Sequence, residues 1–197
     1  KIETLRSMLA RFEESGLVAD PTALLLKLIR TRPQVLTRSG EKLEETLEVL
    51  RSNGFADKDV VQVLLKNPNI LGYNPKSLEQ KLLFLREYGL DRDEVKDFFV
   101  ASPKLFDLSV VTNLRPTFSF FLETGWEVAV LCQFPQVLNY SLDKRIRPRY
   151  DFLRTHAPSY DPVGRYQWVT CSDQDFAKVA NSTLAAWLAF QKARSAL

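Results

Sequence analysis

The sequence is poor in the side chains that bind metals and build catalytic centres. It contains one histidine, His156, and two cysteines, Cys132 and Cys171, with no Cys-x-x-Cys pair. Zinc sites and disulfide frameworks need several such residues at short spacings. We therefore expect neither a metal nor a cofactor, and the cysteine usage favours a reducing compartment.

Glycine is scarce too, and long apolar runs are absent. Seven glycines in 197 residues argue against an all-β fold, whose tight turns need glycine. No apolar run approaches the roughly 18 residues of a membrane-spanning helix, so we expect no membrane partner. The sequence also lacks a glycine-rich phosphate loop and a recognisable set of nucleophile and base. This predicts a non-enzymatic protein without a small-molecule substrate.

What the sequence does contain is one spacing of apolar residues that repeats five times. An apolar residue is followed by others four and seven positions later and, in four copies, by a glycine eleven positions later. The copies are Leu5/Leu9/Phe12/Gly16, Leu43/Leu47/Leu50/Gly54, Leu78/Leu82/Leu85/Gly89, Leu114/Phe118/Phe121/Gly125 and Ile146/Tyr150/Leu153, where Ala157 replaces the glycine. Repeats of about 20 to 50 residues indicate solenoids or arrays.

A second motif closes the first four repeats, and it consists of a proline followed by two apolar residues. The matches are Pro33-Gln34-Val35-Leu36, Pro68-Asn69-Ile70-Leu71, Pro103-Lys104-Leu105-Phe106 and Pro135-Gln136-Val137-Leu138. The prolines are 35, 35 and 32 residues apart. A generic helical bundle explains the apolar spacing but not this recurrence, so a repeat fold is the better interpretation.

Each repeat predicts a helix, a glycine turn, a second helix and a proline turn with one short turn of 3₁₀ helix. Such a hairpin cannot bury its apolar residues alone, so neighbours must stack into an all-α solenoid. We expect a single repeat domain over residues 1–197, with repeats at roughly 1–38, 39–73, 74–108, 109–140 and 141–170. A cap over 171–197 should contain a final helix from about Asp173 to Lys192. The fourth repeat is shortened between Gly125 and Pro135, and the fifth lacks its proline motif.

These motifs together resemble the mitochondrial transcription termination factor (mTERF) family. Arg147-Pro148-Arg149-Tyr150-Asp151-Phe152-Leu153 is similar to its recurrent Pro-x3-Phe-Leu helix start, and Cys171-Ser172-Asp173-Gln174-Asp175-Phe176 is similar to its closing segment. The resemblance implies an mTERF-like superhelix in an organellar protein, mitochondrial or alternatively chloroplastic. It further implies binding to duplex DNA or structured RNA in transcription, ribosome assembly or translation. The chain starts at Lys1 rather than Met, and a targeting peptide ahead of it would not be visible.

Basic residues are the candidate contacts to nucleic acid, because Lys and Arg supply most of the sequence-independent affinity for phosphates. The net charge is only +3, so their distribution matters more than their number. Two clusters stand out. The first, residues 144–154, contains five basic residues and a single acid. The second, residues 27–38, begins at Lys27 and contains no acid. We expect contacts from Lys144, Arg145, Arg147, Arg149 and Arg154, from Arg115, and from Arg30, Arg32 and Arg38. The alternative is that these residues are solvated helix faces.

The low net charge favours structured RNA, in particular ribosomal RNA, over duplex DNA as the partner. Ribosomal or other organellar proteins are further expected partners. A DNA-binding transcription termination or regulation factor is the first alternative. A protein-interaction scaffold that uses acidic helix faces such as Glu41/Glu44/Glu45/Glu48 is the second.

Overall fold

The computed structural model describes residues 2–195, which contain helices and turns and no strand. The expected all-α class is confirmed. The described residues fall into two compact units, which divide between Val110 and Val111. The single continuous repeat domain stays a prediction, and each unit is described by itself below.

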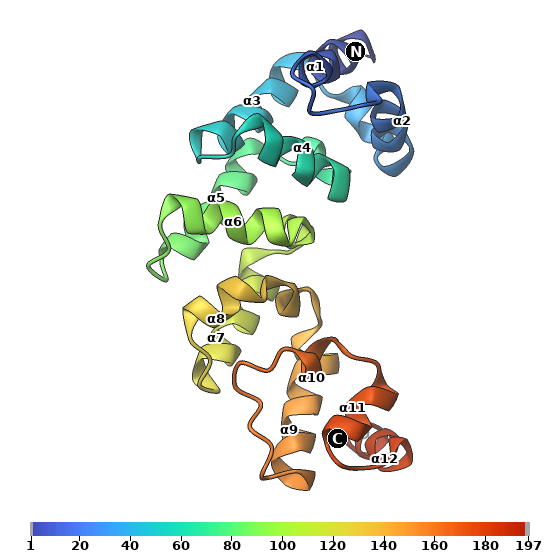
Figure 1. The fold of residues 1–197 in the computed structure, drawn as a ribbon, viewed down its shortest axis with the longest axis vertical. Helices are drawn as coiled ribbons and strands as arrows, with labels where there is room; N and C mark the ends of the chain where they lie inside the picture. Colours follow the sequence, from blue (N-terminus) through green and yellow to red (C-terminus); the bar gives the residue numbers. More distant parts are fainter. Residues whose placement is uncertain (1, 196–197) are drawn as a thin grey trace. The chain divides into compact units, whose positions relative to one another are not determined.

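The first unit contains three helical hairpins, each closed by a 3₁₀ turn (Figure 1). In chain order its elements are α1 (Ile2–Glu14), α2 (Pro21–Thr31), η1 (Pro33–Thr37), α3 (Gly40–Ser52), α4 (Asp57–Lys66), η2 (Pro68–Gly72), α5 (Pro75–Arg86), α6 (Arg92–Ala101) and η3 (Pro103–Asp107). Helix α3 contacts α5, α4 contacts α6, and the turns η1, η2 and η3 contact one another in sequence. The hairpins therefore stack so that first helices, second helices and 3₁₀ turns each form a row.

The repeated leucines build the core of this stack. Leu43, Leu47 and Leu50 are buried on one face of α3, as the i, i+4, i+7 spacing predicts. The second helices add their own apolar face, and Phe99 of α6 stacks on Phe106 of η3 at 4.0 Å between ring centroids. The glycine after α5, Gly89, has a φ of +87°. This left-handed conformation ends the helix and is cheap only for glycine.

The proline motif forms a 3₁₀ turn in each of the first four repeats, as expected. In η2, Pro68, Ile70 and Leu71 are all buried. The buried Asn67, which caps this turn, reaches the next one, where its side-chain amide donates to the Pro103 carbonyl and to Asp107, both at 2.9 Å. The turns are thus linked to their neighbours by side chains as well as by apolar packing.

The second unit contains the shortened fourth repeat and the divergent fifth. Its elements are η4 (Val110–Leu114), α7 (Arg115–Glu123), α8 (Val128–Gln133), η5 (Pro135–Asn139), η6 (Leu142–Ile146), α9 (Arg147–His156), α10 (Gln167–Thr170), α11 (Asp173–Val179) and α12 (Leu184–Ser195). Helix α8 has six residues, where α4 and α6 have ten. The sequence-based expectation of a shortened fourth repeat is confirmed.

Two wide π-helical turns, η4 and η6, lead into α7 and α9. At the end of η6 the amide of Arg147 bonds to the carbonyl of Leu142, five residues back. The next residue is Pro148, which has no N–H to continue the ladder. The helix therefore begins before Pro148, with Ser141 as its cap, rather than at the proline as the sequence motif suggests.

The expected final helix from Asp173 to Lys192 is wrong in one respect, because the structure divides it into α11 and α12. Asn181 lies between them with a φ of +47°. Asparagine is among the few residues that adopt this conformation without large strain. The amide of Ser182 then bonds back to the Ala177 carbonyl at 2.9 Å, which closes the turn.

The structure also explains why the fifth repeat has no glycine at Ala157. This residue follows α9 with a φ of −137°, an ordinary value for any L-residue. The left-handed turn comes later, at Gly164, where φ is +70°. The fifth repeat thus leaves its first helix along a different path.

Arg149 lies at the centre of the second unit and its side chain is fully buried. Its guanidinium donates to the carbonyls of Trp168 at 2.8 Å and Cys171 at 3.0 Å, and to the carboxylate of Asp173 at 2.6 Å. It also lies over the ring of Phe176, 4.6 Å from the centroid. Arg149 therefore joins α9 to α10 and α11.

This position corrects the expectation that Arg149 contacts a phosphate. A guanidinium with no exposed surface and several internal acceptors is not available to a nucleic acid. Trp168 is buried as well and donates through Nε1 to the Pro162 carbonyl. Both residues hold the C-terminal helices together.

We expect replacement of Gly89 by alanine to lower the free energy of unfolding by about 1 kcal/mol, because alanine is strained at positive φ. No atom lies within 4 Å of the added Cβ, so the strain acts alone. Gly89→Asn should cost less, since asparagine tolerates this conformation. Urea unfolding followed by circular dichroism measures both; equal losses would contradict the conformational explanation.

We expect Arg149→Met to lower the free energy of unfolding of the second unit by about 3 kcal/mol, because several buried carbonyls lose their donor. The matched control is Arg154→Met on the same helix, where the side chain is exposed. Exposed substitutions of this kind usually change stability by less than about 0.5 kcal/mol. The role given to Arg149 is wrong if the two variants unfold at the same urea concentration.

Candidate nucleic-acid interface

The basic residues expected in the first unit flank the first 3₁₀ turn, η1: Arg30 and Arg32 precede it, and Arg38 follows it. Arg30 is exposed near the end of α2, and Arg32 follows that helix directly. Arg32 crosses to the next repeat, where its guanidinium lies over the Tyr73 ring at 5.6 Å from the centroid. It passes so close to Gly72 that a Cβ there would lie 2.6 Å from its Nε. Gly72 thus makes room for this crossing.

Tyr73 follows η2 directly, and its ring is held in one position. Its hydroxyl donates to Asp107, and burial together with this hydrogen bond raises the pKa of the phenol. The ammonium of the buried Lys81 lies 5.6 Å from the same ring, and burial lowers the pKa of that lysine. The ring therefore contacts two cations, Arg32 from the junction of α2 and η1 and Lys81 from α5, and is not a free stacking surface.

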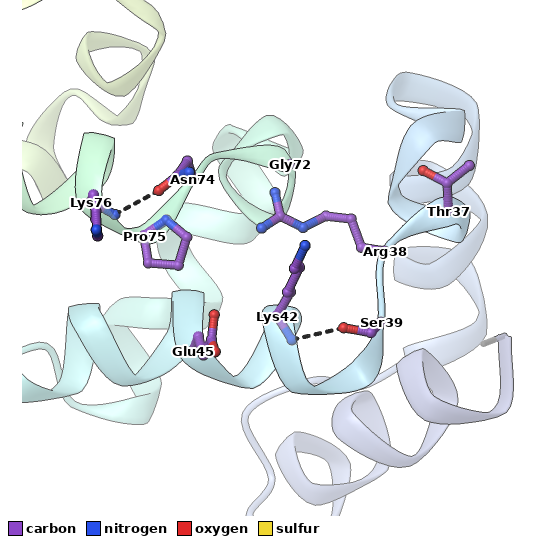
Figure 2. Close-up of a pocket in the computed structure, with 9 residues that line it drawn as sticks. All are labelled: Thr37, Arg38, Ser39, Lys42, Glu45, Gly72, Asn74, Pro75 and Lys76. Carbon is purple, nitrogen blue, oxygen red and sulfur yellow. Dashed lines mark hydrogen bonds between the residues drawn. The ribbon is translucent and has the colours of Figure 1, made fainter.

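Arg38 joins the first two repeats through its guanidinium. Its Nη1 donates to the Tyr73 carbonyl at 2.8 Å, while its Nε is buried without a hydrogen-bond partner. Burial lowers the pKa of Arg38, and the nearby charge of Glu45 opposes that effect. The Nη1 side of the guanidinium is thus held in place, next to a cleft of about 810 Å³ (Figure 2).

This cleft brings together residues from the starts of α3 and α5. Lys42 and Lys76 lie in the first turns of those two helices, and with Arg38 they give the cleft three cations against one acid, Glu45. Figure 2 shows the Lys42 side chain directed toward the Arg38 guanidinium. The remaining lining residues are small or polar: Thr37, Ser39, Gly72, Asn74 and Pro75.

Sequence reasoning missed Lys42 and Lys76 because it looked for basic residues close together in the chain. A signal was nevertheless present. Negative charge is favoured in the first turn of a helix, and positive charge is not. The second helices α4 and α6 obey this rule with Asp59 and Glu94 as the third residue after the cap. In α3 the same position is Lys42.

In the second unit the expected residues separate into buried and exposed groups. Arg145 is half-buried: its Nε donates to the Val169 carbonyl at 2.7 Å, and its guanidinium lies over the Tyr140 ring at 4.6 Å. Burial, with the nearby charge of Arg149, lowers the pKa of Arg145. Arg145 therefore helps to anchor the segment around α10, as Arg149 does.

The other basic residues predicted as contacts in this unit are exposed to different degrees. Arg147 lies over the Phe120 ring at 4.8 Å and pairs with Asp143 at 3.5 Å. Arg115 is exposed on α7. Lys144 and Arg154 are exposed, and neither has an ion-pair partner within residues 2–195. Lys144 is the third residue after the capping Ser141, the position that Lys42 holds after Ser39.

Other kinds of site find little support among the described residues. Residues 2–195 hold no group of three or more His, Cys, Asp or Glu side chains placed to bind a metal ion. Cys132 and Cys171 form no disulfide within the described part of the chain. None of the described helices has the length and apolar character needed to cross a bilayer.

Three relatives carry names that point to organelles. The chain is 31% identical over 86 residues to transcription termination factor MTERF15, mitochondrial, of Arabidopsis thaliana, an alignment of 44% of this chain and 19% of the relative. It is 26% identical to transcription termination factor MTERF8, chloroplastic, of the same plant, over 80% of this chain and 38% of the relative. It is 27% identical to human transcription termination factor 2, mitochondrial, over 70% of this chain and 37% of the relative.

The chain thus spans less than two fifths of the length of these relatives. The sequence model of the mTERF family matches residues 2–177, nearly the whole chain. The repeated hairpins and proline-led 3₁₀ turns lie within that match. The chain belongs to the mTERF family.

Proposed function

We propose that this protein is a non-enzymatic nucleic-acid-binding factor of organellar gene expression. The family and the organellar names of its relatives support the class of function. The observation that carries the binding step is a charge pattern: the exposed lysines Lys42, Lys76 and Lys144 lie near the starts of α3, α5 and η6, where the helix dipole favours an anion. A phosphate placed there would interact with the lysine and with the helix dipole together.

Structured RNA is the partner we favour, with a ribosomal role as the finer proposal. A net charge of +3 is small for a protein that grips duplex DNA unaided. A duplex-DNA-binding termination factor is the second candidate, and the names of the relatives favour it. Mitochondria and, alternatively, chloroplasts are the proposed locations, and ribosomal or other organellar proteins are proposed partners.

In the second unit we assign the contacts to Lys144 and Arg154 first, because both are exposed and neither forms an ion pair with another described residue. Arg115 and Arg147 on the same unit, and Arg30 on the first, remain proposed contacts. Arg32 and Arg38 are held by Tyr73 and contribute charge from fixed positions. Arg145 and Arg149 act through the fold, since their guanidiniums are bonded to carbonyls around α10.

We expect the double variant Lys144→Glu/Arg154→Glu to bind an RNA hairpin roughly tenfold more weakly at about 0.1 M salt, and to reduce the slope of log K against log salt by about 1 to 2. Fluorescence anisotropy with labelled RNA hairpin, DNA duplex and single strands measures this. Lys178→Glu is the control, because Lys178 is exposed on α11 in an ion pair with Asp175.

The outcomes separate the proposals. Tighter binding of the duplex than of the hairpin would favour the DNA factor. If the double variant binds like Lys178→Glu, the contact assignment is wrong. Absence of binding to every nucleic acid at low salt would overturn the proposed function and leave the protein-interaction scaffold as the better interpretation.

A further inference from the structure

The cleft between the starts of α3 and α5 has the chemistry of an anion site. Three side chains on its wall are cationic, Arg38, Lys42 and Lys76, and only Glu45 is acidic. Lys42 and Lys76 are exposed, and within residues 2–195 neither ammonium has an ion-pair partner. Each can therefore turn toward a ligand without breaking an existing contact.

Arg38 differs from the two lysines because it is already fixed. The bond from Nη1 to the Tyr73 carbonyl holds the guanidinium beside the cleft, and the buried Nε has no acceptor. A cation whose position is set before binding loses little conformational entropy when a ligand arrives. The two lysine side chains can move toward a ligand, whereas the arginine side chain is held in one position.

Two helix starts add to the positive potential at this site. Ser39 caps α3 through the amide of Lys42, and Asn74 caps α5 through the amide of Lys76, as Figure 2 shows. The lysines thus add charge where the helix dipoles are already positive, in α5 with no acid in the first turn and in α3 beside Glu41. By contrast, α4 and α6 carry Asp59 and Glu94 at their starts, each bonded back to the cap amide.

The shape and lining of the cleft narrow the class of anion. The cleft is an open space of about 810 Å³ with polar walls and no aromatic side chain among its lining residues. Organic ligands and cofactors are generally held in largely apolar pockets. Lysine binds phosphate as a flexible point charge, and arginine offers several donors to its oxygens.

We infer that this cleft binds a phosphodiester group of a nucleic-acid backbone, held by Lys42, Lys76 and Arg38. The inference rests on the proposed function. It places one binding site in the first unit, and two of the residues in that site, Lys42 and Lys76, lie outside the basic clusters found in the sequence. Contacts to phosphate position a nucleic acid without reading its sequence, so this cleft recognises charge and not base identity. Glu45 limits the affinity because it is the one acid facing the bound group.

The test uses single charge reversals, Lys42→Glu and Lys76→Glu, and their combination. The control is Lys58→Glu, because Lys58 also lies exposed in the first turn of a helix, α4, but stands between Asp57 and Asp59 and away from the cleft lining. Probes are a labelled RNA hairpin and a DNA duplex of the same sequence, each titrated at several salt concentrations. Circular dichroism and melting temperature check that every variant is folded.

We expect each cleft variant to lower the affinity roughly fivefold to tenfold and the double variant to lower the salt slope by about 1 to 2, while Lys58→Glu stays within about twofold of the wild type. Loss with both probes identifies a site for the shared phosphodiester, and loss with one probe identifies its source. A double variant that binds both probes like Lys58→Glu overturns the cleft assignment and leaves the proposed function standing. A wild-type protein that binds neither probe overturns both.

Glu45→Gln provides the converse test. Removing the only acid of the cleft should strengthen binding about threefold, because repulsion of the phosphate is lost. Glu48→Gln is the matched control: it lies on the same helix, is exposed, and does not line the cleft. An equal gain in both variants would indicate a general charge effect and would contradict the site.

Discussion

The proline that ends each second helix is the constraint on which the rest of the structure depends. Since it can neither donate a backbone hydrogen bond nor allow the preceding residue a helical conformation, the chain must turn at that point. The turn is a short 3₁₀ helix that buries the two apolar residues after the proline, as Ile70 and Leu71 show. In the first unit, contacts between η1, η2 and η3 then set the order in which hairpins stack.

That stacking has a consequence for charge. Each first helix starts just after a 3₁₀ turn, so a row of turns also brings the starts of neighbouring first helices together. Lys42 and Lys76 meet at one cleft for this reason, although they are 34 positions apart in the chain. The second helices α4 and α6 carry acids in their first turns, as helix starts normally prefer. In these two repeats the starts of α4 and α6 are thus closed by their own acids, whereas Lys42 and Lys76 give the starts of α3 and α5 cations, with Glu41 beside Lys42 in α3.

Much of the fold follows from the sequence because its signals are local and repeated. The spacing of Leu43, Leu47 and Leu50 predicts the buried face of α3, and the left-handed turn at Gly89 follows from the recurring glycine. The break at Asn181 between α11 and α12 was not predictable from apolar spacing alone. It depends on one residue that accepts positive φ.

The candidate site was harder to predict because burial decides which basic residues are available. Arg149 and Lys144 are five positions apart in one basic cluster, yet Arg149 is buried with carbonyl partners and Lys144 is exposed. Those carbonyls belong to α10 and the residue after it, about twenty residues after Arg149 in the chain. No local sequence pattern predicts that they accept from Arg149. Lys42 and Lys76 were missed for the opposite reason, since their proximity arises only from stacking.

The central claim is that nucleic acid binds along the starts of first helices. Hydrogen–deuterium exchange of the protein with and without an RNA hairpin tests it most directly, because the amides at those helix starts lie where the phosphates are placed. The account predicts slower exchange on binding in residues 38–45, 74–79 and 141–147, and no change in residues 56–60 and 91–95 at the starts of α4 and α6. Protection confined to the starts of the second helices, with none at the first, would contradict it.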